Sequence, residues 1–120
     1  MSAALDLNAV RDELAAEIAV ALGETVLVTT DSRSISPPCV LLGVPSWEVS
    51  TARTLRVFLP IHVLAVPPGH GDAVRWMLDR ASEITVAVRP TLEGRSGPYD
   101  TSERILPAVT ILATRDVAFC

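Results

Sequence analysis

The longest regular pattern in the chain is an alternation of apolar and mixed residues over 54–66. The segment reads TLRVFLPIHVLAV, and its odd positions from Leu55 to Ala65 are all apolar. A period of two predicts a β-strand with one continuous apolar face. Because Pro60 donates no backbone hydrogen bond, it indicates an edge position or a bulge in the middle of this strand. A long strand with a buried face needs partners from the rest of the chain.

Two segments instead have apolar residues at the spacing of an amphipathic helix. The first spans 6–22, with Asp6 as the expected N-cap and Gly23 just past the C-terminal end. Its expected inward residues are Leu7, Val10, Leu14, Ile18 and Ala21.

The second helix follows the turn PPGHGD at 67–72, in which Asp72 is the expected N-cap. It runs from 73 to 86 or 88. The β-branched end, ITVAV, would also suit an extended segment. The expected inward residues are Val74, Met77, Leu78, Ala81, Ile84 and Thr85.

Three further runs, 25–30, 39–44 and 106–117, have the β-branched and apolar character of strands. The expected order is therefore α-β-β-β-α-β. This pattern predicts a single α+β domain over 1–120, with two helices packed on a mainly antiparallel sheet.

Two polar segments connect these elements. The segment 45–53, PSWEVSTAR, is longer than a tight turn and is expected to project as an extended arm between the second and third strands. The segment 89–104 is rich in Gly and Pro and is expected to be a long polar loop.

The overall charge is −4, and the ten basic residues are scattered along the chain. Proteins that track phosphates cluster Lys and Arg, so this balance argues against a groove-reading nucleic-acid binder. An acidic surface past which DNA moves stays compatible with it. Apolar residues make up 49% of the chain, which favours burial of surface against other subunits; an Ala- and Val-rich composition of GC-rich coding origin is the alternative.

No run approaches the roughly 20 apolar residues of a membrane helix. The first residues, MSAALDLNAVRDE, carry acids and lack the pattern of a signal peptide, so we expect a chain made in the cytoplasm. The two cysteines, Cys39 and Cys120, form no C-x-x-C motif.

Catalytic and metal signatures are missing from the sequence. His62 lies on the mixed face of the long strand and His70 in the GHGD turn, where both are expected to be solvated, and no H-x-x-x-H or H-x-H spacing is present. Cys39 sits in a strand, where a cysteine is usually a small buried apolar residue. We expect no cofactor and no metal. A small enzyme or ligand-binding domain that uses Cys39 or a histidine is the alternative of a different class.

Both tryptophans fall outside the expected core. Trp47 lies in the arm, and Trp76 falls on the helix side opposite the apolar stripe. Trp is enriched at protein–protein interfaces, although loops that fold back would also cover it. The expected subunit-interface residues are Trp47, Glu48, Trp76, Arg80 and Tyr99.

Taken together, these features resemble the tail terminator (tail completion) proteins of long-tailed bacteriophages. The resemblance rests on the amphipathic first helix, the extended arm, the PPGHGD entry to the second helix, the polar loop and the closing LPAVTILAT strand. It covers the whole chain as an order of elements. No invariant motif of the family can be quoted, so no functional residue is carried over.

The resemblance implies a structural protein of the virion, made in the cytoplasm of a bacterial host. It implies a homo-oligomeric ring, expected to be a hexamer, that caps the tail tube protein, stops its polymerisation and docks the head–tail connector protein. Genomic DNA would pass through the lumen without specific binding. The expected lumen residues are Glu93, Asp100 and Glu103. A head–tail connector or stopper protein is the alternative of the same kind.

Overall fold

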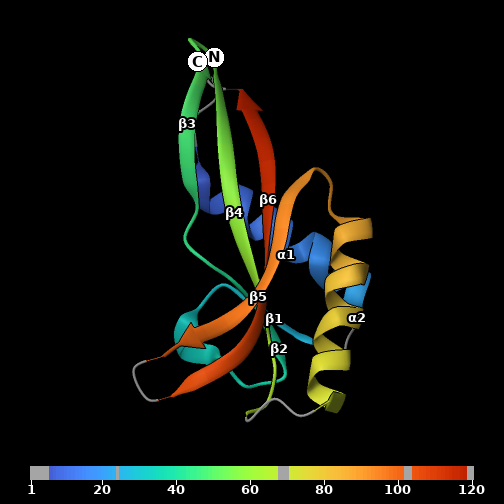
Figure 1. Cartoon of the computed structure of the whole chain (residues 1–120). Coiled ribbons are helices and arrows are strands. Elements are labelled where there is room, and N and C mark those ends of the chain that lie inside the picture. Colours follow the sequence, from blue (N-terminus) through green and yellow to red (C-terminus); the bar gives the residue numbers. More distant parts are fainter. Residues whose placement is uncertain (1–5, 24, 68–70, 102–103, 119–120) are drawn as a thin grey trace.

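A computed structural model describes residues 6–23, 25–67, 71–101 and 104–118 (Figure 1). It contains two α-helices, one short 3₁₀ helix and six strands within those ranges. In chain order these are α1 (Leu7–Leu22), β1 (Leu27–Thr29), η1 (Ser32–Ser34), β2 (Cys39–Leu42), β3 (Ser46–Thr51), β4 (Thr54–Leu64), α2 (Gly71–Ala87), β5 (Thr91–Asp100) and β6 (Ile105–Ala118).

All six strands belong to one sheet with the order β1-β2-β4-β6-β5, and β3 also pairs with β4. β1 and β2 are parallel, whereas every other pair is antiparallel. The predicted α+β class with a mainly antiparallel sheet is therefore confirmed. The predicted strand at 54–66 is β4, which lies at the centre and pairs along its whole length with β6.

The sheet has two more strands than predicted, and both lie in the polar segments. The arm at 45–53 contains β3, which forms a hairpin with β4 (Figure 1). The prediction of a polar loop at 89–104 is wrong, because β5 pairs there with β6. Nearly all side chains of β3 and β5 are exposed, so an alternation of apolar and polar residues could not mark them.

Pro60 is neither at a sheet edge nor in a bulge, because β4 is central and Pro60 lies opposite Leu112 of β6. On the side of β4 away from β6, its N-terminal half pairs with β3 and its C-terminal end pairs with β2. The chain crosses from β2 to β3 at 43–45. Gly43 donates its N–H to the carbonyl of Pro60 over 2.9 Å. The N–H and C=O of one strand residue point the same way. The missing donor of Pro60 therefore faces this break in the neighbouring strand.

Both helices pack on one face of the sheet and share one core with it. The buried residues of α1 are Leu14, Ile18 and Leu22, with Leu7 and Val10 partly buried beside them. Ala21 is exposed, so Leu22 takes its expected place. Asp6 caps α1 by accepting a hydrogen bond from the N–H of Ala9 over 3.1 Å, as predicted.

The inward face of α2 differs from the predicted one by a rotation about the helix axis. Met77 and Ile84 are buried as expected, but Val74, Leu78 and Thr85 are exposed. Trp76 packs against the core instead. The expected helical form of ITVAV is confirmed to Ala87, and Asp72 lies in the first helical turn rather than before it.

A smaller apolar cluster lies on the face of the sheet opposite the helices, at β2, the end of β4 and the start of β6. It is covered by Ile35 from the β1–β2 connection and by Tyr99 from β5. Its buried members are Cys39, Leu41, Leu64, Leu106 and Ala108. No helix of the described residues takes part in this cluster.

Candidate subunit interface

The arm formed by β3 and the first half of β4 extends away from the helices (Figure 1). All six residues of β3 are exposed. Trp47 lies opposite the buried Val57 of β4, so its indole is on the helix-bearing face of the sheet, and yet it is 53% exposed. Val49 lies on the same face and is 65% exposed, whereas Glu48 is on the other. Two large apolar side chains therefore face solvent on a strand that pairs along one side.

The tip of the arm is held by short hydrogen bonds. The N–H of Arg53 donates to the hydroxyl of Thr51 over 3.2 Å, and the hydroxyl of Ser50 donates to the carbonyl of Thr54 over 3.1 Å. These bonds close the turn between β3 and β4 within the hairpin itself. The outer edge of β3 pairs with no other strand among the described residues.

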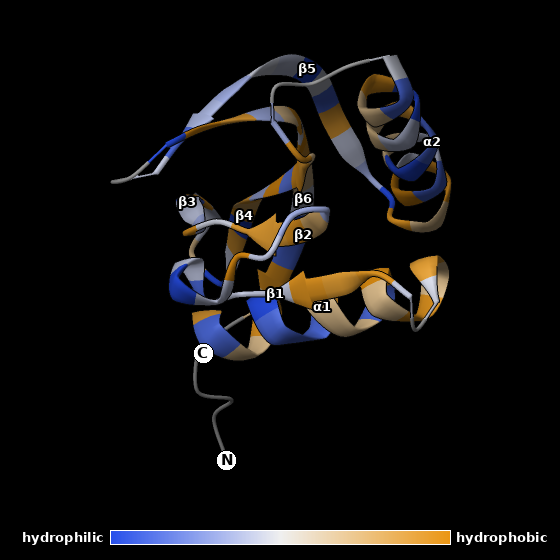
Figure 2. Ribbon diagram, turned by 90° about the horizontal axis from the view of Figure 1, so that it is seen from below, coloured by the Kyte–Doolittle hydropathy of each residue, from blue (hydrophilic) through white to orange (hydrophobic). Residues whose placement is uncertain are grey.

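β5 is the edge strand on the other side of the same sheet. It is the most polar strand, and Figure 2 colours much of it pale or blue. Arg95 and Glu93 lie on one face and form an ion pair of 3.5 Å between exposed side chains. Gly94 and Ser96 lie on the other face, where they leave the surface flat. β3 and β5 are thus two dissimilar open edges on opposite sides of the sheet, and the three-residue β1 is a further edge on the side of β3.

The prediction that Trp76 lies off the core is contradicted. Its side chain is half-buried against the main core, and the guanidinium of Arg80 lies 5.9 Å from the centre of its ring. Arg80 also forms an ion pair of 3.0 Å with Glu83 on the same helix. A cation over an indole within about 6 Å is a stabilising contact. This pair therefore stabilises α2 from within, on a helix that is separate from the strand that carries Trp47.

Tyr99 packs against His62 with ring centres 4.9 Å apart and planes tilted by 49°. The ring nitrogen Nδ1 of His62 lies 2.9 Å from the hydroxyl of Thr110. His62 is half-buried, so the expectation of a solvated histidine is wrong, and burial lowers its pKa from the usual value of 6.5. These three side chains fasten β5 and β6 to the centre of the sheet.

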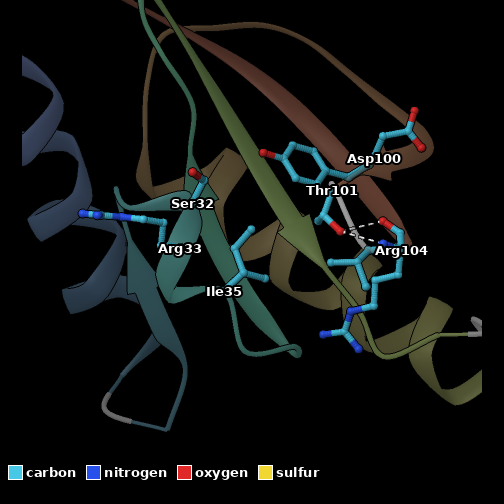
Figure 3. Close-up of a pocket in the computed structure, with 8 residues that line it drawn as sticks. Ser32, Arg33, Ile35, Asp100, Thr101 and Arg104 are labelled. Atoms are coloured by element: carbon cyan, nitrogen blue, oxygen red, sulfur yellow. Dashed lines mark hydrogen bonds between the residues drawn. The ribbon is translucent and has the colours of Figure 1, made fainter.

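The expected lumen residues occupy different environments. Glu93 is paired with Arg95, as described above, and Glu103 lies outside the described residues. Asp100 lines a hollow of about 490 Å³ with residues from the β1–β2 connection and the β5–β6 turn (Figure 3). A uniformly acidic wall therefore does not follow from these three positions.

Two polar side chains that line the hollow, those of Arg33 and Thr101, already make hydrogen bonds within the chain. Arg33 extends away from Asp100 and Arg104 (Figure 3) and donates to the carboxylate of Asp31 over 3.2 and 3.3 Å. This pairing lowers the pKa of Asp31 and raises that of Arg33. The hydroxyl of Thr101 donates to the carbonyl of Arg104 over 2.7 Å and accepts from its N–H over 2.9 Å. These two hydrogen bonds join Thr101 to the main chain of Arg104, where the chain passes from β5 to β6.

Cys39 is buried in the smaller apolar cluster, as expected for a packed thiol. Burial raises its pKa, which keeps the thiol protonated and unreactive at neutral pH. No group of three His, Cys, Asp or Glu side chains suited to a metal occurs within the described ranges, and His70 lies outside them. Neither helix in the described part of the chain has the length and apolar character that a membrane crossing needs.

No protein-family model matches the chain, and the search of curated proteins found no match. The candidate interface therefore rests on the structure itself. Sequence reasoning found the arm and Trp47. It missed the open edge of β5, whose signal would have been the run of polar and small residues at 93–97, EGRSG, shortly before an obvious strand.

Proposed function

We propose that this chain is a structural subunit of a bacteriophage tail. Copies of it assemble into a ring, which we expect to be hexameric, on the end of the tail tube. The ring stops polymerisation of the tube protein and provides the surface to which the head–tail connector docks. DNA passes through its lumen without specific binding, and the protein resides in the virion.

One observation carries the proposal: β3 and β5 are open, dissimilar edges on opposite sides of the sheet, and β3 bears exposed Trp47 and Val49. An exposed flat strand edge is a template for pairing with another chain. Two different surfaces that fit each other on neighbouring copies generate a ring if the rotation closes. Assembly through repeated contacts of this kind needs no catalytic site. A buried thiol at Cys39 and a half-buried imidazole at His62 give no support to the enzyme alternative.

The test is assembly in the presence of the tube. The mass of the full chain is measured by light scattering and native mass spectrometry, and the chain is then added to polymerising tube protein from the same virus. We expect a ring, tubes that stop growing, and a ring seen at one tube end by electron microscopy. A ring that binds connector protein but leaves tube growth unchanged would assign the chain to the neck instead. A chain that stays monomeric alone and on tubes would refute the proposal.

A further inference from the structure

We propose that the ring is closed by main-chain pairing between β3 of one copy and β5 of the next. This inference rests on the proposed function, since it requires that the chain form a ring. β3 and β5 are open edges on opposite sides of the sheet, so the contact joins two different surfaces and passes from copy to copy. The other open edge, β1, is only three residues long. Addition of a strand to an exposed sheet edge is a common mode of association.

The direction of the strands is compatible with this contact. β3 is antiparallel to β4, and β5 is antiparallel to β6, which is itself antiparallel to β4. β3 and β5 therefore run in opposite directions. A rotation about a ring axis that continues the sheet from copy to copy keeps these directions in every copy. The pairing between neighbouring copies is antiparallel.

The side chains select one register. Residues directly opposite each other share a face of the sheet. On the face without helices, Glu48 lies opposite Arg95. Glu48 has no ion pair within the described part of the chain, and Arg95 has only the long contact to Glu93. The carboxylate of the arm thus meets a guanidinium across the strands.

In the same register, large side chains of β3 lie opposite small residues of β5 on the helix-bearing face. Trp47 lies opposite Ser96, and Val49 lies opposite Gly94, so the two large exposed side chains of β3 cover two small residues of β5 on this face. A large side chain across from a glycine shields the bare backbone of an edge strand. Pro45 and Pro98 also fall opposite each other. Because proline donates no backbone hydrogen bond, the ladder ends there on both strands.

For the ring to close, the strands must be tilted relative to the ring axis. Trp47 pairs at the level of Val57 on β4, whereas Ser96 pairs through Val109 at the level of Val63. The contact thus steps along the strand by roughly 20 Å, at about 3.4 Å per residue. Four strand spacings per copy cover about 19 Å at about 4.8 Å each. The resulting tilt is about 45°, close to the roughly 35–45° of closed barrels.

Cysteine cross-linking tests the register directly. In a Cys120→Ser background, which leaves the buried Cys39 as the native thiol, the full chain receives Ser46→Cys together with Gly97→Cys. These residues face each other in the proposed pairing, and a Cβ at Gly97 meets no atom within 4 Å. Opposite Cα atoms of an antiparallel pair lie at a distance that a disulfide spans. We expect oxidised protein to give a ladder of covalent species up to the full ring.

The matched control is Ser46→Cys with Ser96→Cys, which is one residue out of register and on opposite faces, and which we expect to stay uncross-linked. Glu48→Cys alone tests a symmetric contact between two β3 strands, in which Glu48 would lie opposite its own copy. Dimers from that variant, or a ladder only from the out-of-register pair, would overturn the inference.

Charge reversal provides a second, independent readout. Glu48→Arg and Arg95→Glu should each raise the concentration needed for half-assembly about threefold, and the double variant should restore it, as for an exposed pair of opposite charges. If wild-type rings form but neither cross-linking nor rescue occurs, the proposed pairing of β3 with β5 is wrong, whereas the proposed ring is supported. If the wild-type chain forms no ring at all, both the proposed function and the proposed strand pairing are wrong.

Discussion

The guanidinium of Arg115 on β6 donates to the carboxylate of Glu17 on α1 over 2.9 Å. The same side chain also donates to the carbonyls of Arg89 and Thr114, over 3.1 and 2.8 Å. This one arginine of β6 therefore ties together the first helix, the connection between α2 and β5, and the last strand.

Because three acceptors lose their donor, we expect Arg115→Ala to lower the free energy of unfolding by about 1–3 kcal/mol. Urea denaturation measures this change. Arg56→Ala is the matched control, since Arg56 makes an ion pair of 3.3 Å with Asp116 in which both side chains are well exposed. That change should cost less than about 1 kcal/mol. Equal losses in the two variants would contradict the role given to Arg115.

Two valines on neighbouring strands separate stability from assembly. Val57 is fully buried on β4, whereas Val49 on β3 is 65% exposed. Val57→Ala should reduce the free energy of unfolding by about 2 kcal/mol, because it removes buried apolar groups and leaves a cavity. Val49→Ala should change it by less than about 0.5 kcal/mol and weaken association of the subunits. Unfolding and light scattering on both variants check this.

The two tryptophans should behave differently from each other. Trp76→Ala removes a half-buried ring that packs on the core and lies near Arg80, so we expect a loss of monomer stability. Trp47→Ala should leave thermal unfolding of the monomer unchanged and reduce assembly. Circular dichroism melts and sedimentation would distinguish the two effects. A destabilised Trp47→Ala monomer would mean that the arm is part of the folding unit.

Gly43 allows a close approach of the chain to the middle of β4. A Cβ at this position would lie 2.9 Å from Cγ of Pro60 and 3.0 Å from Nε2 of His62. We expect Gly43→Ala to destabilise the fold by about 1–3 kcal/mol, because the rigid proline ring cannot turn away. Gly97→Ala, where the added atom meets nothing within 4 Å, is the control and should be close to neutral. Chemical denaturation measures both.

His62 should make stability depend on pH. Burial lowers its pKa in the folded state below the usual 6.5, so the unfolded chain binds the proton more readily. The stability contributed by the neutral imidazole is complete above about pH 6.5 and is lost as the pH falls from there towards the folded-state pKa. Unfolding measured between about pH 8 and pH 5.5 should show this loss in the wild type. His62→Gln should remove most of the slope.

How much the sequence predicted follows from which residues are buried. β4 and α1 were predictable because their apolar residues repeat with the period of their structure and face the same core. β5 was not, since its pairing is a main-chain interaction with β6 and its side chains are nearly all exposed. The error on α2 has a similar origin. Val74 and Leu78 are apolar but exposed, while the amphipathic Trp76 and Arg80 lie towards the protein.

The candidate interface also has one part that the sequence indicated and one part that it did not. Trp47 was predictable because a large aromatic residue stood in a polar segment between two strands. The complementary edge depends on strand order, which brings β5 to the far side of the sheet from β3. That order is a property of the whole fold and not of any local pattern.

The separate pairing of β2 and β3 with one edge of β4 also bears on how such a chain can diverge. The break at 43–45 separates β3 from β2, and β3 contributes no residue to the main core, so the tip of its hairpin can lengthen or shorten without repacking the helices. Such changes must come two residues at a time in each strand, because a single insertion would turn every later side chain to the other face. Homologous chains should therefore differ in arm length by even steps, and their partners should differ with them.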